Sequence, residues 1–140
     1  MQESPTDSVK CKALKAALAG RPEGQIIPIE KFFDGNDDPA SIGCNLSSHP
    51  GIERFREILQ GLVTRSDIAA VYARISEVDP GPGSWPFTDT ILIVGTISPE
   101  ELRDLLIELE PDEIAPAADF GVAPSIGQKH GLPALAAWWD

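Results

Sequence analysis

The 140-residue chain is acidic: 22 Asp and Glu residues oppose 11 Lys and Arg residues, for a formal net charge of −11 at pH 7. Hydrophobic residues make up 42% and charged residues 24% of the chain, which predicts one globular domain with a buried core. The charge argues against direct binding to nucleic acid or to an anionic membrane, because both select basic patches. It favours a basic protein partner or cations, although acidity can also serve solubility alone.

Neither the apolar runs nor the N-terminus indicates export or membrane insertion. No run approaches the roughly 20 apolar residues that span a bilayer. The N-terminal segment has acids before its lysines, unlike a secretory signal peptide. Two cysteines, Cys11 and Cys44, are too few and too far apart for a disulfide framework or a zinc site. We therefore expect a cytoplasmic protein with two reduced thiols and no cofactor.

The first predicted element is a short helix over residues 5–19. Ser4 or Thr6 can cap it, and its alanines have high helix propensity. A Gly-Arg-Pro-Glu-Gly sequence ends it. Because its apolar face is weak, we divide the chain into an N-terminal helix and linker at 1–24 and a single α+β domain at 25–140.

A strand over 25–33, a polar loop and an amphipathic helix over 51–64 come next. Pro28 lacks an N–H group and so favours a sheet edge or a bulge. Ser47 or Ser48 can cap the helix, whose apolar residues recur at helical spacing between charged ones. These apolar positions are Ile52, Phe55, Ile58, Leu59, Leu62 and Val63.

The second half of the chain predicts two strands, a helix and a last strand. Apolar and polar residues alternate over 68–78, and the more apolar run at 89–97 predicts a central strand. Ser98 and Glu101 have the spacing of a capping box, so a helix begins there. Residues 132–139 form the last predicted strand.

This order, strand, helix, strand, strand, helix, strand, predicts a ferredoxin-like βαββαβ fold. In that fold an antiparallel sheet carries two helices on one face. Pro28 conflicts with it, because the first strand of the fold is internal. A rearranged α+β sheet is the alternative.

Three long connections emerge at the same end of a ferredoxin-like sheet. They are the loops at 34–50, 79–88 and 111–131. Loops of this length are often functional. We therefore expect any binding site at this end of the fold.

The loop after the first strand has part of a calcium-binding pattern. Asp34, Asn36 and Asp38 have the 1, 3, 5 spacing of an EF-hand loop, but Pro39 replaces the required glycine and Asn45 the required glutamate. We predict a solvated turn and no metal site. A different cation site would draw on the acids Glu77, Asp79 and Asp89.

Nucleophilic catalysis and nucleotide binding find little support. Cys44 and His49 share a loop, but a nucleophile and its base need hydrogen-bond contact and an orienting third group. A half-buried thiol and a surface histidine are the simpler interpretation. The glycines in 121–127 lack P-loop spacing. We predict no catalytic residue.

Two aromatic pairs have alternative interpretations. Trp85 and Phe87 flank a proline, and either pack inward to hold the 79–88 hairpin or form an exposed binding anchor. Trp138 and Trp139 on one strand must face opposite sides of the sheet. One enters the core, and the other lies on an open sheet face or an edge, unless the N-terminal helix or a second copy of the chain covers it. The second case would give a homodimer.

The segments FFDGNDDPASIGCNLSSHPG and WPFTDTILIV, with the final WWD, resemble an uncharacterised family of small acidic bacterial proteins. The resemblance covers much of residues 30–140. It implies a bacterial, cytosolic, single-domain protein. It implies no activity, cofactor or catalytic residue.

Our leading hypothesis is a non-catalytic interaction module, immunity or antitoxin-like, whose acidic loop end binds a basic protein. The alternative is a small enzyme, or a ligand- or metal-binding protein, with a pocket between the three long loops. A third is a structural, oligomer-forming subunit built on the terminal tryptophans. The candidate binding residues are Asp34, Asn36, Asp37, Asp38, Asn45, His49, Trp85 and Phe87.

Overall fold

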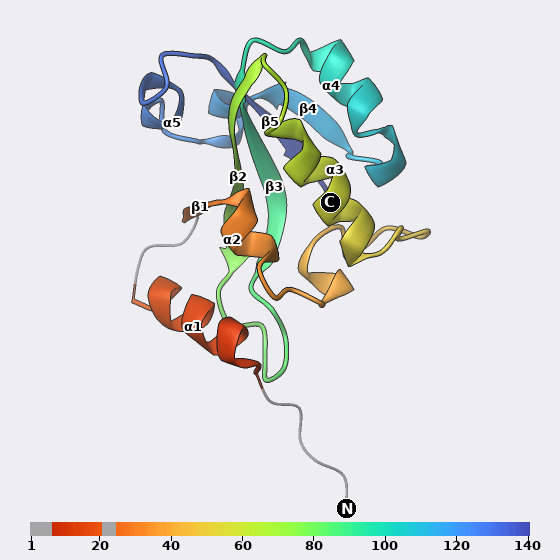
Figure 1. The fold of residues 1–140 in the computed structure, drawn as a ribbon, viewed down its shortest axis with the longest axis vertical. Helices are drawn as coiled ribbons and strands as arrows, with labels where there is room; N and C mark the ends of the chain where they lie inside the picture. The colour runs from red at the N-terminus through yellow and green to blue at the C-terminus, as the bar shows by residue number, and fades with distance from the viewer. Residues whose placement is uncertain (1–6, 21–24) are drawn as a thin grey trace, which may run out of the picture.

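The computed structural model describes residues 7–20 and 25–140. Their strands form one five-stranded antiparallel sheet in the order β1-β2-β3-β5-β4. Figure 1 shows the long β2–β3 hairpin at the centre of the sheet, with α1 beside its tip. The strands are β1 (Ile26–Pro28), β2 (Ile68–Glu77), β3 (Phe87–Gly95), β4 (Glu113–Pro116) and β5 (Ala134–Trp138).

The main core lies between one face of the sheet and its helices. The helices are α1 (Val9–Leu18), α2 (Ile29–Phe33), α3 (Ile52–Leu62), α4 (Pro99–Leu105) and α5 (Ser125–Gln128). Phe55 and Leu59 of α3 and Leu102 of α4 are fully buried in the same cluster as Ile91 and Ile93 of β3. This confirms an α+β fold, in which α1 and α2 also contribute side chains to the core.

The ferredoxin-like strand order is not confirmed. β1 is an edge strand that pairs antiparallel with β2, whereas a ferredoxin-like fold would place it inside the sheet. The predicted strand over 25–33 ends at Pro28, and the chain then forms α2. Pro28 lacks an N–H group, which suits a short edge strand. The same property makes Pro28 conflict with an internal first strand, as the sequence had indicated.

The helix cap predicted from the sequence is confirmed at α4 and wrong at α3. Ser98 caps α4, and its hydroxyl accepts a hydrogen bond from the N–H of Glu101 (3.1 Å). Ser8 caps α1, while the caps predicted at Ser4 or Thr6 lie outside the described residues. α3 begins after Gly51 without a side-chain cap, so the prediction of Ser47 or Ser48 was wrong. Among the described residues, no helix has the length and apolar character to cross a bilayer.

The second face of the sheet is covered by a segment that we call the strap, residues 117–133. A smaller apolar cluster joins Leu92 and Ala136 of the sheet to Ala117 and Val122 of the strap. Most of the strap falls in the connection 111–131, which was predicted as a loop and instead contains β4 and α5. It crosses a sheet face that had been expected to be open.

A buried lysine attaches α1 to the turn of the β2–β3 hairpin. The ammonium of Lys15 donates to both carboxylate oxygens of Asp7 (2.9 and 3.0 Å) and to the carbonyl of Gly81 (3.0 Å), and lies 3.0 Å from Asp79. These bonds satisfy a charge that burial would otherwise penalise. Cys11 and Leu18 of α1 belong to the main core.

We expect Asp7→Asn to weaken the dependence of stability on acid pH. Hydrogen bonds from Lys15 and from the N–H of Gly83 lower the pKa of Asp7 in the folded state. A lowered pKa stabilises the fold above the unfolded pKa, and this contribution is lost as the pH falls through the folded value. The variant should lose less stability below about pH 4 than the wild type.

Urea denaturation at a series of pH values measures this difference. Asp104→Asn removes the same charge from α4 and shows how much of the change comes from net charge alone. Equal pH profiles for the wild type and Asp7→Asn would contradict the assignment of Lys15 as the partner.

Candidate functional site

Two adjoining pockets form a concave surface beside the end of β5, which we call the acidic cleft. Their volumes are about 210 and about 300 Å³. They share four lining residues: Gly43, Asn45, Trp139 and Asp140. Loop 40–47 forms one wall, the start of β3 forms a second, and residues 110–112 form a third. Ser76 of β2 and residues 138–140 complete the lining, so the cleft joins five separate segments of the chain.

Residues 138–140 hold these segments together. The carbonyl of Trp138 accepts from the N–H of Asp112 (2.8 Å), and the N–H of Trp139 donates to the carbonyl of Asp89 (2.9 Å). The N–H of Asp140 donates to the Asp112 carboxylate (2.7 Å), and its carbonyl accepts from the Asn45 amide (3.0 Å). The last strand therefore fixes the shape of the cleft.

Carboxylates dominate the charge of the cleft. Asp89, Glu110, Asp112 and Asp140 line it, and no lysine or arginine of the described residues does so. Nor do the ion pairs of those residues include any of the four carboxylates. Several carboxylates around one concave surface produce a negative potential that attracts cationic groups. The cleft is chemically suited to basic side chains.

Asn45 and Phe87 are the predicted binding residues that line the acidic cleft. Asn45 is exposed and bound to Asp140, and Phe87 is half-buried at the start of β3. Cys44 is exposed and lines the smaller pocket beside them. The later part of loop 34–50 therefore lines the acidic cleft, and its role in binding stays a prediction.

The earlier part of the loop has other roles. Asp34 forms an exposed ion pair with Lys10 (2.5 Å) and lines a wider pocket of about 620 Å³, with Lys31 and Arg56 in its wall. Asp37 is exposed. The acids of this loop thus do not converge on one site.

Asn36 and Asp38 build the turn itself. Asn36 is buried, donates to the hydroxyl of Ser41 (2.9 Å) and accepts from the N–H of Asp38 (2.9 Å). The Asp38 carboxylate accepts from the N–H groups of Ala40 and Trp85 (both 3.0 Å). The pattern that resembled an EF-hand is a hydrogen-bonded turn, as expected for Asn and Asp at these positions.

Both ring nitrogens of His49 bind the backbone. Nδ1 accepts from the N–H of Gly51 (2.9 Å), so Nε2 carries the proton and donates to the carbonyl of Ile42 (2.9 Å). A general base needs a nitrogen free to accept a proton. His49 is therefore a structural residue that supports loop 42–51, and it does not form a pair with Cys44.

Trp85 is buried at 3% exposure in the main core, so it packs inward and holds the hairpin. Asp38 and Trp85 bring loop 34–50 against hairpin 79–88, as predicted. An isolated bridge between Ile42 and Thr88 joins the same two segments. The third loop predicted at this end, residues 111–131, contributes only its beginning. Residues 110–112 reach this end, whereas the strap crosses the other sheet face.

No cluster of three or more potential metal ligands occurs within residues 7–20 and 25–140. Of the acids considered for a cation site, Asp79 pairs with Lys15, and Asp89 lines the acidic cleft. Glu77 is exposed at the end of β2. These three do not come together around one point.

The terminal tryptophans face opposite sides of the sheet, as predicted. Trp139 is 2% exposed in the main core. Trp138 is half-buried, with its ring 6.5 Å from that of Phe120 in the strap. The strap thus supplies neighbours for the second indole, and homodimerisation stays a prediction.

Sequence reasoning missed three of the cleft carboxylates: Glu110, Asp112 and Asp140. They follow a helix end or the last strand, and acidic residues at such positions are usually solvent-exposed without a binding role. Their meeting depends on β4, which pairs Glu113 with Trp138. No local pattern in the sequence predicts that pairing.

Comparison with known proteins places the chain in a recognised group. The model of the "Uncharacterized protein YfbO family" matches residues 9–135. The chain is 26% identical over 117 residues to "Uncharacterized protein YfbO" of Escherichia coli (strain K12), covering 82% of each chain. No solved structure matches. The resemblance to an uncharacterised family of bacterial proteins is confirmed.

Proposed function

The chain belongs to the uncharacterised YfbO family, and from its geometry we propose that it is a non-catalytic interaction module. The acidic cleft binds a basic protein, as the binding surface of an immunity or antitoxin-like protein does. The partner inserts Lys or Arg side chains between loop 40–47 and residues 110–112.

One observation carries this proposal. Asp89, Glu110, Asp112 and Asp140 border a single concave surface that no described basic residue lines. Unpaired carboxylates accept charge-assisted hydrogen bonds from guanidinium or ammonium groups, which are stronger than neutral ones. The net charge of −11 adds long-range attraction, which raises the rate of encounter with a basic partner.

The alternative, an enzyme with acid/base groups in the long loops, has less support. A catalytic set needs its groups within hydrogen-bond reach of one reacting atom. Asp34 pairs with Lys10, Asp38 holds the backbone of Trp85, and His49 holds loop 42–51. Asp34, Asp38 and His49 therefore serve local structure.

Partner capture with charge variants tests the proposal. The tagged chain is used at low salt to capture proteins from extracts of the source organism, beside a variant carrying Asp89→Asn, Glu110→Gln and Asp112→Asn. A control variant with Glu100→Gln, Asp104→Asn and Asp119→Asn has the same net charge, but its changes lie outside the cleft. We expect a basic protein to be retained by the wild type and the control and lost by the cleft variant.

The salt dependence of the purified complex gives a second measurement. Affinity should fall about tenfold or more between roughly 0.05 and 0.3 M salt, because screening weakens exposed charge pairs. The proposal would be contradicted if only acidic or neutral proteins were retained, or if the cleft variant and its control bound the partner equally.

A further inference from the structure

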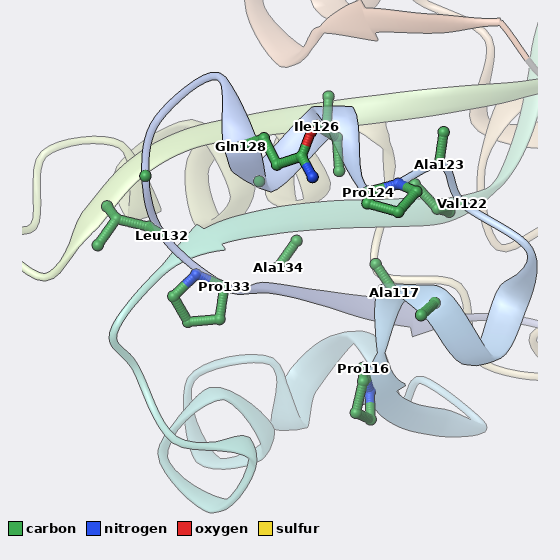
Figure 2. A pocket seen from close by; sticks show the side chains of 13 residues that line it. Pro116, Ala117, Val122, Ala123, Pro124, Ile126, Gln128, Leu132, Pro133 and Ala134 are labelled. Atoms are coloured by element: carbon green, nitrogen blue, oxygen red, sulfur yellow. The ribbon is translucent and has the colours of Figure 1, made fainter.

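Another pocket lies at the opposite end of β5 from the acidic cleft. Its volume is about 380 Å³, and Pro116, the strap and Ala134 line it, so we call it the strap pocket. Figure 2 shows the side chains of Ala117 and Ala134 pointing into the space that Pro124 and Gln128 border from the other side. The acidic cleft includes Trp138, at the other end of the same strand.

The wall of the strap pocket is uncharged. Charged residues make up 24% of the chain, yet none of the thirteen described residues that line this pocket is charged. Gln128 supplies the one side-chain amide of these thirteen residues, and the remaining side chains have no hydrogen-bonding group. Alanines and glycines are common in the wall, so short side chains leave the space open.

Hydrogen bonds on either side of the pocket keep the strap from collapsing into it. Arg74 donates to the carbonyl of Phe120 (2.6 Å), and the hydroxyl of Tyr72 bonds to Nε2 of His130 (2.8 Å). The N–H of Gly95 donates to the carbonyl of Pro133 (3.0 Å). These bonds tie the beginning, the later part and the end of the strap to β2 and β3.

The turn of the strap is equally fixed. The N–H of Leu132 donates to the carbonyl of Gly127 (3.1 Å). A Cβ atom on Gly127 would lie 2.5 Å from the carbonyl oxygen of Leu132, so the close approach requires glycine at this position. The pocket is therefore a preformed feature of the fold, and a ligand does not have to order its wall.

We infer that the strap pocket binds a small, neutral, largely apolar organic molecule. Its volume lies within the range of small-molecule sites, about 300–1,000 Å³. An anionic or cationic ligand would lose hydration without gaining a partner from the wall. A peptide would leave backbone N–H and C=O groups against side chains that cannot bind them. One polar group on the ligand would be met by Gln128 at the edge of the pocket.

Fluorescence titration of the full chain with N-phenyl-1-naphthylamine tests this inference. This neutral aromatic probe becomes brighter when it enters an apolar site, and we expect a saturable rise at one probe per chain. Ala134→Leu places a larger side chain in the pocket and should weaken binding about tenfold, through lost volume and contact. Ala115→Leu is the matched control, because Ala115 is also half-buried but lies on β4 outside the pocket wall. It should change the affinity by less than about twofold.

Two further comparisons distinguish a blocked pocket from a misfolded protein and test the effect of ligand charge. Ala123 is exposed at the pocket wall, so Ala123→Leu should weaken probe binding without disturbing the core. Ala69→Leu, at an exposed site on β2 outside the pocket, should leave probe binding unchanged. The 8-sulfonate of the same probe should bind about tenfold more weakly, because its charge must be desolvated. Absence of saturable binding, equal effects of each variant and its control, or equal affinity for the sulfonate would overturn the inference.

Discussion

Replacing Trp139 by alanine is expected to lower the free energy of unfolding by about 3–5 kcal/mol, the range for truncating a large buried aromatic side chain. The indole is 2% exposed, and its ring centre lies 5.9 Å from that of Phe55. Its Nε1–H donates to the carbonyl of Leu109 (2.7 Å), which joins the last strand to the segment after α4. The substitution removes the packing and leaves that carbonyl without its donor.

Urea denaturation of three variants separates these contributions. Trp139→Phe keeps most of the packing and should cost about 1–2 kcal/mol through the lost hydrogen bond and smaller ring. Trp138→Ala is the neighbouring control and should cost about 1 kcal/mol, because that side chain is half-buried. Similar losses for the Trp138 and Trp139 alanine variants would contradict the burial difference on which the prediction rests.

Gly95→Ala should destabilise the protein by about 3 kcal/mol, at the upper end for forcing atoms into a packed site. Gly95 ends β3, and its backbone pairs with Ile68 across the sheet. A Cβ atom there would lie 2.2 Å from the carbonyl oxygen of Asp67 and 2.9 Å from the Cα of Ile68. Both neighbours are backbone atoms, so relief requires the start of β2 to move.

Gly61→Ala provides the matched control in α3. Apart from the adjacent residues and the backbone of α3 itself, no described atom lies within 4 Å of a Cβ built at Gly61, and alanine is the better helix former. This variant should gain about 0.5 kcal/mol. Thermal or urea denaturation measures both changes, and a stabilising or neutral effect of Gly95→Ala would show that the strand end can adjust.

Local chemistry explains the elements that were predicted correctly. The alternating pattern of 68–78 became β2, the apolar run at 89–97 became most of β3, and Ser98 capped α4. In each case the sequence pattern that predicts the element lies within a few residues of the hydrogen bonds or the buried side chains that stabilise it. Such elements carry their information in adjacent side chains.

The errors concern pairing between distant segments. Residues 29–33 had strand-like composition, yet Pro28 ended the strand and the phenylalanines were buried from a short helix instead. β4 was missed because its four residues gain stability from β5, which follows about twenty residues later. The side chains of Asp34, Asp37 and Asp38 do not meet at one site, because the fold gives Asp34 and Asp38 separate partners and leaves Asp37 exposed.

The sequence by itself determined the acidic character, the α+β class and the region of loop 34–50 as one wall of a candidate site. These follow from composition and from periodicities of two and 3.6 residues. Tertiary structure alone decided that Asp89, Glu110, Asp112 and Asp140 border one cleft, and that the strap lines an uncharged pocket on the other sheet face. Both sites depend on β4 and β5 pairing, a long-range arrangement whose energy comes from contacts that no local pattern records.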